Sequence, residues 1–187
     1  MTVQGVQPLA NEPLRTALRE YAGRLPAEAA LVEAFLELLD GPEDPFVRQR
    51  DAGHFTGSAW LVDRRGERVL LTHHRKLDRW LQLGGHADGD RDLAGVALKE
   101  AEEESGLTGL RVEPAIFDLD RHWIPARADV PGHWHYDARY VLHAGDDENF
   151  VVSDESHALA WREIAPIARD ADESMRRMAA KWLQRRR

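Results

Sequence analysis

The sequence predicts a mixed α/β (α+β) fold in which helices cover the faces of a mixed β-sheet. Three observations predict this class. Apolar residues recur at helical spacing before residue 54, β-forming residues dominate after it, and a helical period returns before the C-terminus. At 187 residues the chain is long enough for one well-buried domain with a small helical addition.

Residues 1–53 are predicted to form a helical N-terminal extension, followed by the main domain at residues 54–187. Leu14, Leu18 and Tyr21 recur at helical spacing, and a second apolar stripe follows. We expect a helical hairpin that packs on the main domain or on a second copy of the chain in a homodimer. A lid over the active site is the alternative function for these helices.

The stretches assigned to strands are rich in β-branched and aromatic residues and are bounded by turn residues. Two of them flank a glycine-containing loop and predict a hairpin. Met175, Met178 and Trp182 recur at helical spacing and predict a terminal helix. The predicted strands are residues 55–62, 68–72, 80–83, 110–117, 133–142 and 158–161.

An acidic helix after a glycine turn is the most informative stretch of the chain. The turn is at residues 84–85, and helix-forming residues run from 93 to 104. Asp90 or Asp92 is the candidate N-cap, and Gly106 is where a left-handed C-terminal residue would lie. These signals predict a helix with well-defined ends.

Three carboxylates share one face of this helix. At 100° per residue, Glu100, Glu103 and Glu104 fall within an arc of about 100°. Like charges at these spacings destabilise an isolated helix, so we expect a cation there, and hard divalent cations prefer oxygen ligands. The alternative is an ordinary solvated helix face.

The stretch from Gly85 to Leu107 resembles the Nudix box. That family pattern is Gly, five residues, Glu, seven residues, Arg-Glu, an apolar residue, any residue, Glu-Glu, any residue, Gly and an apolar residue. Starting at Gly85, the pattern falls without a gap on Glu100, Ala101, Glu103, Glu104, Gly106 and Leu107.

Two positions depart from the family pattern. Lys99 replaces the arginine, which keeps the charge but loses the planar fork that can hold a carboxylate with two hydrogen bonds. Arg91 replaces the first glutamate, and a shift of one residue would let Asp90 take that role. These departures keep open a second function, that of a Nudix-like domain that senses a nucleotide or metabolite without cleaving it.

The resemblance implies an α/β/α sandwich and hydrolysis of a nucleoside diphosphate linked to another moiety, with Mg²⁺ or Mn²⁺. It implies metal binding by Glu100, Glu103, Glu104 and the carbonyl of Gly84. Glu103 and Glu104 are catalytic candidates. Glu155 resembles a late loop glutamate that some members use as base or ligand, although a solvated loop residue is the alternative.

Other candidates for substrate binding lie close to the box. Arg75 and Arg79 precede the glycine turn and could hold a terminal phosphate, although solvated turns are the alternative. His86 directly follows the turn. Zinc is not expected, because His133 and His135 share a strand face without the carboxylate or cysteine ligands that would define a site.

Composition excludes several classes. A formal net charge of −8 argues against nucleic acid as a partner, so we expect a small-molecule substrate that arrives with metal ions. The absence of cysteine excludes thiolate catalysis and disulfides. It also argues against the isomerases of the Nudix fold, which resemble one another in using a cysteine at the reacting centre. Without a membrane span or signal peptide pattern, we expect a cytoplasmic protein that does not bind membranes.

Overall fold

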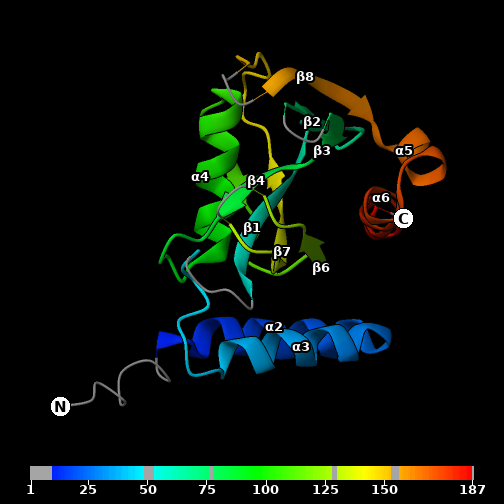
Figure 1. Cartoon of the computed structure of the whole chain (residues 1–187). Coiled ribbons are helices and arrows are strands. Elements are labelled where there is room, and N and C mark those ends of the chain that lie inside the picture. Colours follow the sequence, from blue (N-terminus) through cyan, green and yellow to red (C-terminus); the bar gives the residue numbers. More distant parts are fainter. Residues whose placement is uncertain (1–9, 49–52, 76–77, 128–129, 153–155, 187) are drawn as a thin grey trace.

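The computed structural model describes residues 10–48, 53–75, 78–127, 130–152 and 156–186. These form an eight-stranded mixed sheet with the path β3-β2-β1-β7-β5, to which β4 adds on β1, β6 on β7 and β8 on β2. In Figure 1, α4 covers one face of the sheet and α5 and α6 cover the other. The predicted α/β/α sandwich with a mixed sheet is therefore confirmed.

The helices occur near the predicted positions, with α5 as an addition that the sequence analysis did not predict. They are α2 (Glu12–Arg24), α3 (Ala29–Leu39), α4 (Leu93–Ser105), α5 (Ile164–Asp170) and α6 (Glu173–Arg185), with a short 3-10 helix, η1 (Pro26–Glu28). None of the described helices has the length and apolar character needed to cross a bilayer.

The strands differ from the prediction in two places. They are β1 (Gly53–Val62), β2 (Arg68–His74), β3 (Arg79–Leu81), β4 (Leu83–His86), β5 (Arg111–Val112), β6 (Asp118–Ile124), β7 (His133–His143) and β8 (Ser156–Glu163). The single strand expected at residues 110–117 is wrong, because only β5 lies there and the longer β6 follows it. The strand expected at 80–83 is divided, since β3 pairs with β2 whereas β4 pairs with β1.

The central strand β1 is buried along all ten of its residues. It runs parallel to β7 and antiparallel to β2 and β4. Alternate side chains enter two cores. Phe55 and Leu61 pack in the cluster that includes α4, whereas Trp60 and Val62 pack with residues of α6.

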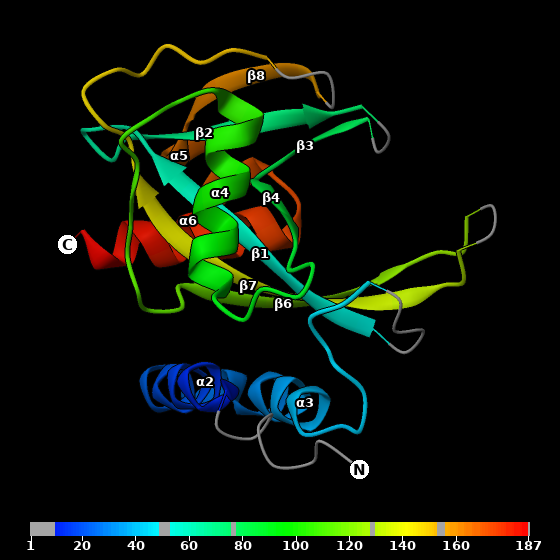
Figure 2. The same cartoon turned by 90° about the vertical axis from the view of Figure 1, so that its left-hand side faces the viewer.

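The N-terminal helices pack against the sheet of the same chain. Phe35 of α3 lies with its ring centroid 5.8 Å from Phe55 and 5.3 Å from Tyr136, and the stripe of α2 is buried in the same cluster. Lys181 of α6 donates to the hydroxyl of Tyr21 at 2.7 Å. Figure 2 shows α2 and α3 side by side beneath the sheet. The apolar stripes are therefore used within the chain, and the division at residue 53 stays a prediction.

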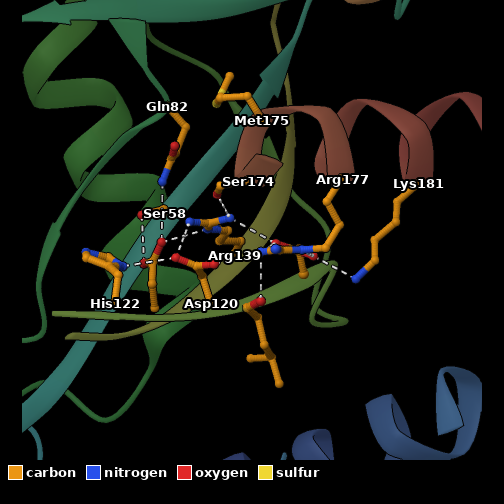
Figure 3. Close-up of polar contacts among 12 residues, drawn as sticks. Ser58, Gln82, Asp120, His122, Arg139, Ser174, Met175, Arg177 and Lys181 are labelled. Atoms are coloured by element: carbon orange, nitrogen blue, oxygen red, sulfur yellow. Dashed lines mark hydrogen bonds and ion pairs between the residues drawn. The ribbon is translucent and has the colours of Figure 1, made fainter. Parts of the chain in front are cut away.

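A buried ionic network joins the sheet to α6 (Figure 3). Asp118 accepts from Arg139 at 2.9 Å, from Arg177 at 3.0 Å and from Lys181 at 2.6 Å. Burial alone would raise the pKa of Asp118, but the hydrogen bond from Arg177 and the neighbouring positive charges outweigh it and hold the pKa below its usual value. This pairing explains why so polar a segment as β6 forms a strand.

Candidate active site

Both ends of α4 are capped as the sequence predicts. Asp92 is the N-cap and accepts from the backbone N–H of Gly95 at 3.1 Å. Asp90 instead accepts from the N–H of Asp92 at 3.0 Å and stabilises the loop before the helix. Gly106 closes the helix in a left-handed conformation, with φ of 68°. These caps fix the register of α4 relative to the glycine turn.

Glu104 of α4 is bound to the glycine turn. Its Oε1 accepts from the backbone N–H of Gly84 at 2.9 Å. Gly84 has φ of 155°, and a Cβ atom there would lie 2.4 Å from Ser58 Oγ, so this position requires glycine. The strand and the helix therefore hold this carboxylate between them.

Glu100, one helical turn earlier, packs directly on Gly85. A Cβ atom at Gly85 would lie 2.3 Å from Cδ of Glu100 and 2.5 Å from each carboxylate oxygen. The carboxylate thus occupies space that exists only because residue 85 has no side chain. Carboxylate and backbone carbonyl oxygens are the ligands that hard divalent cations take, so these residues fit such an ion.

Glu103 and Glu155 are not part of this contact with the turn. The side chain of Glu103 is 61% exposed, and its nearest cationic partner is Lys99 at 3.8 Å. Lys99, at the arginine position of the family pattern, is likewise exposed. Glu155 lies outside the described residues. The structure thus brings Glu100 and Glu104 to the turn at Gly84, and leaves Glu103 facing solvent.

Arg91 connects the loop before α4 to the N-terminal extension. Its guanidinium donates to Asn11 Oδ1 at 2.7 Å and to Asp44 Oδ2 at 3.0 Å. It also lies over the ring of Phe46, 4.8 Å from the centroid. The residue that replaces the family's first glutamate therefore has a structural partner far away in the sequence. Asp90, the proposed substitute, is exposed.

We expect Arg91→Glu to lower stability more than activity. The new carboxylate would face Asp44 and lose two charge-assisted hydrogen bonds, a cost of about 1–3 kcal/mol. That corresponds to a fall in Tm of roughly 2–10 °C for a chain of this size. We expect kcat within about threefold of wild type, because the hydrogen bonds that the change breaks are those to Asn11 and Asp44 of the N-terminal extension.

Thermal unfolding and turnover measured on the same preparation check this expectation. Arg91→Gln is the control, since it removes the positive charge without introducing repulsion and should lie between wild type and Arg91→Glu in Tm. Loss of turnover at unchanged Tm would contradict the structural role of Arg91.

Gly85→Ala should separate activity from stability. The new methyl group would collide with the carboxylate of Glu100, which is the end of a flexible side chain. Glu100 can therefore move aside at little cost to the fold, but its carboxylate then leaves the glycine turn. We expect Tm within about 2 °C of wild type and kcat lowered by at least about tenfold. The measurements are a thermal scan and steady-state kinetics.

Gly57→Ala is the matched comparison. A Cβ atom there would lie 2.7 Å from the backbone oxygen of Leu93 and 3.1 Å from Val96, neither of which can move without shifting α4. We expect a clear loss of stability from this variant. If Gly85→Ala lost stability and kept full activity, the proposed position of Glu100 would be wrong.

The predicted substrate-binding residues lie in two places. Arg75 and Arg79 are both exposed near the β2–β3 connection, where Arg75 donates to the backbone oxygen of Ser156 at 3.2 Å. Arg79 also borders a cavity of about 610 Å³ that Trp80 and Arg162 line. His86 is elsewhere, on the next strand.

His86 belongs to a group of histidines that the sequence analysis did not foresee. Its ring centroid lies 5.1 Å from that of His54 and 5.0 Å from that of His135. His133 and His135 share β7 and by themselves offer only two ligands. His54 comes from β1, about eighty residues earlier, and only the parallel pairing of β1 with β7 brings it to them.

Comparison with known proteins identifies the family of the chain. A family model described as the NUDIX domain matches residues 54–183. The chain therefore belongs to the NUDIX family, whose enzymes hydrolyse phosphoanhydride bonds. No protein of curated function matches the chain.

Several solved structures share the fold. A hydrolase of the NUDIX family from Clostridium perfringens is 22% identical, with a TM-score of 0.56, over 72% of this chain and 98% of that chain. The dihydroneopterin triphosphate pyrophosphohydrolase of E. coli is 17% identical, with a TM-score of 0.55, over 74% and 99%. An Ap4A hydrolase of C. elegans is 18% identical, with a TM-score of 0.52, over 70% and 95%. At these identities the similarity is one of fold.

Proposed function

We propose that the chain is a metal-dependent Nudix-type pyrophosphohydrolase that cleaves a nucleoside diphosphate linked to another moiety. The cofactor would be Mg²⁺ or Mn²⁺, and the protein would act on this small molecule in the cytoplasm. The observation that carries the proposal is the contact between α4 and the glycine turn, where Glu104 binds the N–H of Gly84 and Glu100 packs on Gly85.

The metal-holding role is assigned to Glu100, Glu104 and the carbonyl of Gly84. A divalent cation bound there would offset charge on the phosphates and make water a better nucleophile near neutral pH. The N–H of Gly84 orients the carboxylate of Glu104 before any ion binds. Less side-chain freedom is therefore lost when the metal ion binds. A negatively charged protein also gains from a cation that accompanies a polyanionic substrate.

The general base is assigned to an acid near this site. Glu103 is exposed one residue before Glu104, where it can meet solvent water, and it is our first candidate for base or third metal ligand. Glu155 is the second candidate, based on its resemblance to a late loop glutamate of the family. Glu103→Gln should distinguish them, because loss of a base changes the pH profile of kcat.

Membership of the family supports a diphosphate compound as the substrate, and a screen of such compounds is needed to identify which one. The enzymes of similar fold named above act on different phosphate compounds, so the fold does not choose among them. The test is hydrolysis of a dinucleoside tetraphosphate, a nucleoside diphosphate sugar and a nucleoside triphosphate by metal-stripped protein, with and without Mg²⁺ or Mn²⁺. We expect turnover of one class, only with metal, to two phosphate-bearing products.

The alternative function, a sensor that binds without cleaving, has one specific observation in its favour. The family's first glutamate is Arg91 here, and it is engaged with Asn11 and Asp44. Calorimetric titration of the same compounds separates the two functions. Tight binding without turnover of any compound would favour the sensor and contradict the hydrolase.

A further inference from the structure

A second cluster of ligand-type side chains lies away from the acidic helix. Because Gly85 faces Glu100 of α4, the next residue of β4 points to the opposite face of the sheet. There, within the part of the chain that the structure describes, histidines from four strands gather. They are His54 of β1, His86 of β4, His122 of β6, and His133 and His135 of β7.

Three of these rings converge on one point. His54, His133 and His135 each offer one ring nitrogen, and these nitrogens all lie within 4.8 Å of one another. The Nε2 atoms of His133 and His135 are 3.2 Å apart. Tetrahedral Zn²⁺ with Zn–N bonds of about 2.0–2.1 Å places its nitrogen ligands about 3.3 Å apart. The distance between His133 and His135 therefore suits a metal ion, and the ligand nitrogen of His54 would have to approach theirs by at most about 1.5 Å.

The hydrogen bonds of His133 leave the correct nitrogen available. Its Nδ1 lies 2.9 Å from the carbonyl oxygen of Pro131, and a carbonyl can only accept, so Nδ1 carries the proton. With the proton on Nδ1, the nitrogen that can bind a metal is Nε2, the atom that points to His135. A backbone carbonyl that fixes the tautomer of a ligand in this way is typical of metal-binding histidines.

His54 supplies the strongest argument. Only 2% of its surface is exposed, and neither ring nitrogen has a hydrogen-bond partner among the described residues. Buried polar atoms without partners are uncommon and costly. A hydrogen bond between His133 and His135 would explain their 3.2 Å separation, but it would leave His54 unsatisfied. A metal ion that binds all three rings accounts for both observations.

We propose that His54, His133 and His135 bind a divalent transition metal ion of the zinc class, at a site separate from the carboxylates of α4. Imidazole nitrogens suit zinc, cobalt, nickel and copper, whereas Mg²⁺ and Ca²⁺ prefer oxygen. His86, with its ring 5.1 Å from that of His54, is the candidate fourth ligand. The site would fasten the start of β1 to β7.

Two of these rings have pKa values below that of a free imidazole. Burial, together with the charges of neighbouring histidines, lowers the pKa of His54 to about 4 and the pKa of His135 to about 2.

The test is a titration of the metal-stripped 187-residue chain, without a histidine tag, with Co²⁺ in excess Mg²⁺. Magnesium occupies the oxygen ligands of α4, and bound Co²⁺ reports its coordination by visible absorption. We expect one equivalent of tightly bound Co²⁺ with a tetrahedral spectrum, displaced by Zn²⁺. Binding should weaken at least about 100-fold in His135→Gln and His133→Gln.

His157→Gln is the control, because His157 is an exposed histidine on β8 away from the three ligands, and it should bind Co²⁺ like wild type. Circular dichroism of each metal-free variant shows whether it is folded. The proposal is overturned if folded wild-type protein binds no Co²⁺ or Zn²⁺ in excess Mg²⁺, or if His157→Gln weakens binding as much as His135→Gln. Neither result depends on whether the protein hydrolyses diphosphates.

Discussion

We expect Glu104→Gln to lower kcat by about 100- to 1,000-fold and to leave the fold intact, because Glu104 is proposed as a metal ligand and such a ligand contributes several kcal/mol to stabilising the transition state. Glutamine can still accept a hydrogen bond from the N–H of Gly84, so the 2.9 Å contact that positions the side chain survives. The variant therefore loses the negative charge without losing the contact. Steady-state kinetics at saturating Mg²⁺, with Tm measured in parallel, check this expectation.

Glu102→Gln is the matched control for Glu104→Gln. It removes the same charge from the same helix, but residue 102 is outside the glutamates of the box pattern. We expect kcat within about twofold of wild type for this variant. Equal losses in the two variants would mean that the net charge of α4, and not a defined ligand, determines activity.

Asp118→Asn produces the largest expected loss of stability. The change leaves Arg139, Arg177 and Lys181 around a neutral side chain at a site where Asp118 is fully buried. Removing the charge of one partner in a buried ion network lowers the free energy of unfolding by about 3–5 kcal/mol. For a chain of this size we expect Tm to fall by roughly 10 °C. A thermal scan at neutral pH measures it.

Asp146→Asn is the control, since that side chain is 100% exposed and its ion pair with Arg64 should contribute little. The pKa of Asp118 is held below its usual value, so its contribution is present above the ordinary carboxylate pKa near 4 and is lost as the pH falls below it. The wild type should therefore lose its advantage over Asp118→Asn in acid. Equal Tm values at pH 7 would show that the network is not stabilising.

The local features of the site were predictable from the sequence. Capping chemistry limits the N-cap to Asp90 or Asp92, of which the structure shows Asp92, and places the C-terminal end at Gly106. The shared face of Glu100 and Glu104 follows from the helical period. Both depend on residues close together in the chain. The division between the two cores on either side of β1 likewise follows from alternation along one strand.

Features that depend on strand pairing were not predictable. β6 carries Asp118 and Asp120, and aspartates are typical of loops. In the structure, Arg139 of β7 and Arg177 of α6 form ion pairs with these two carboxylates, so that they can lie in a strand. The histidine cluster requires β1 to lie parallel to β7, and periodicity alone does not specify neighbours in a sheet.

Arg91 gives a further example. Arg91 stands where the family pattern has its first glutamate, and its partners Asn11 and Asp44 belong to the N-terminal extension. The sequence shows the residue type at position 91 but does not show which residues it contacts. Such a long-range pairing becomes visible only when the extension is placed on the main domain.

Binding of Mn²⁺ to α4 is the most direct test of the central proposal, because Mn²⁺ prefers oxygen ligands and its free form is counted by electron paramagnetic resonance. The comparison is wild type against the double variant Glu100→Gln/Glu104→Gln, with Zn²⁺ present to occupy any histidine site. The proposal predicts saturable Mn²⁺ binding in wild type, and a loss of at least about 100-fold in affinity in the folded double variant. Undiminished Mn²⁺ binding by the double variant would contradict it.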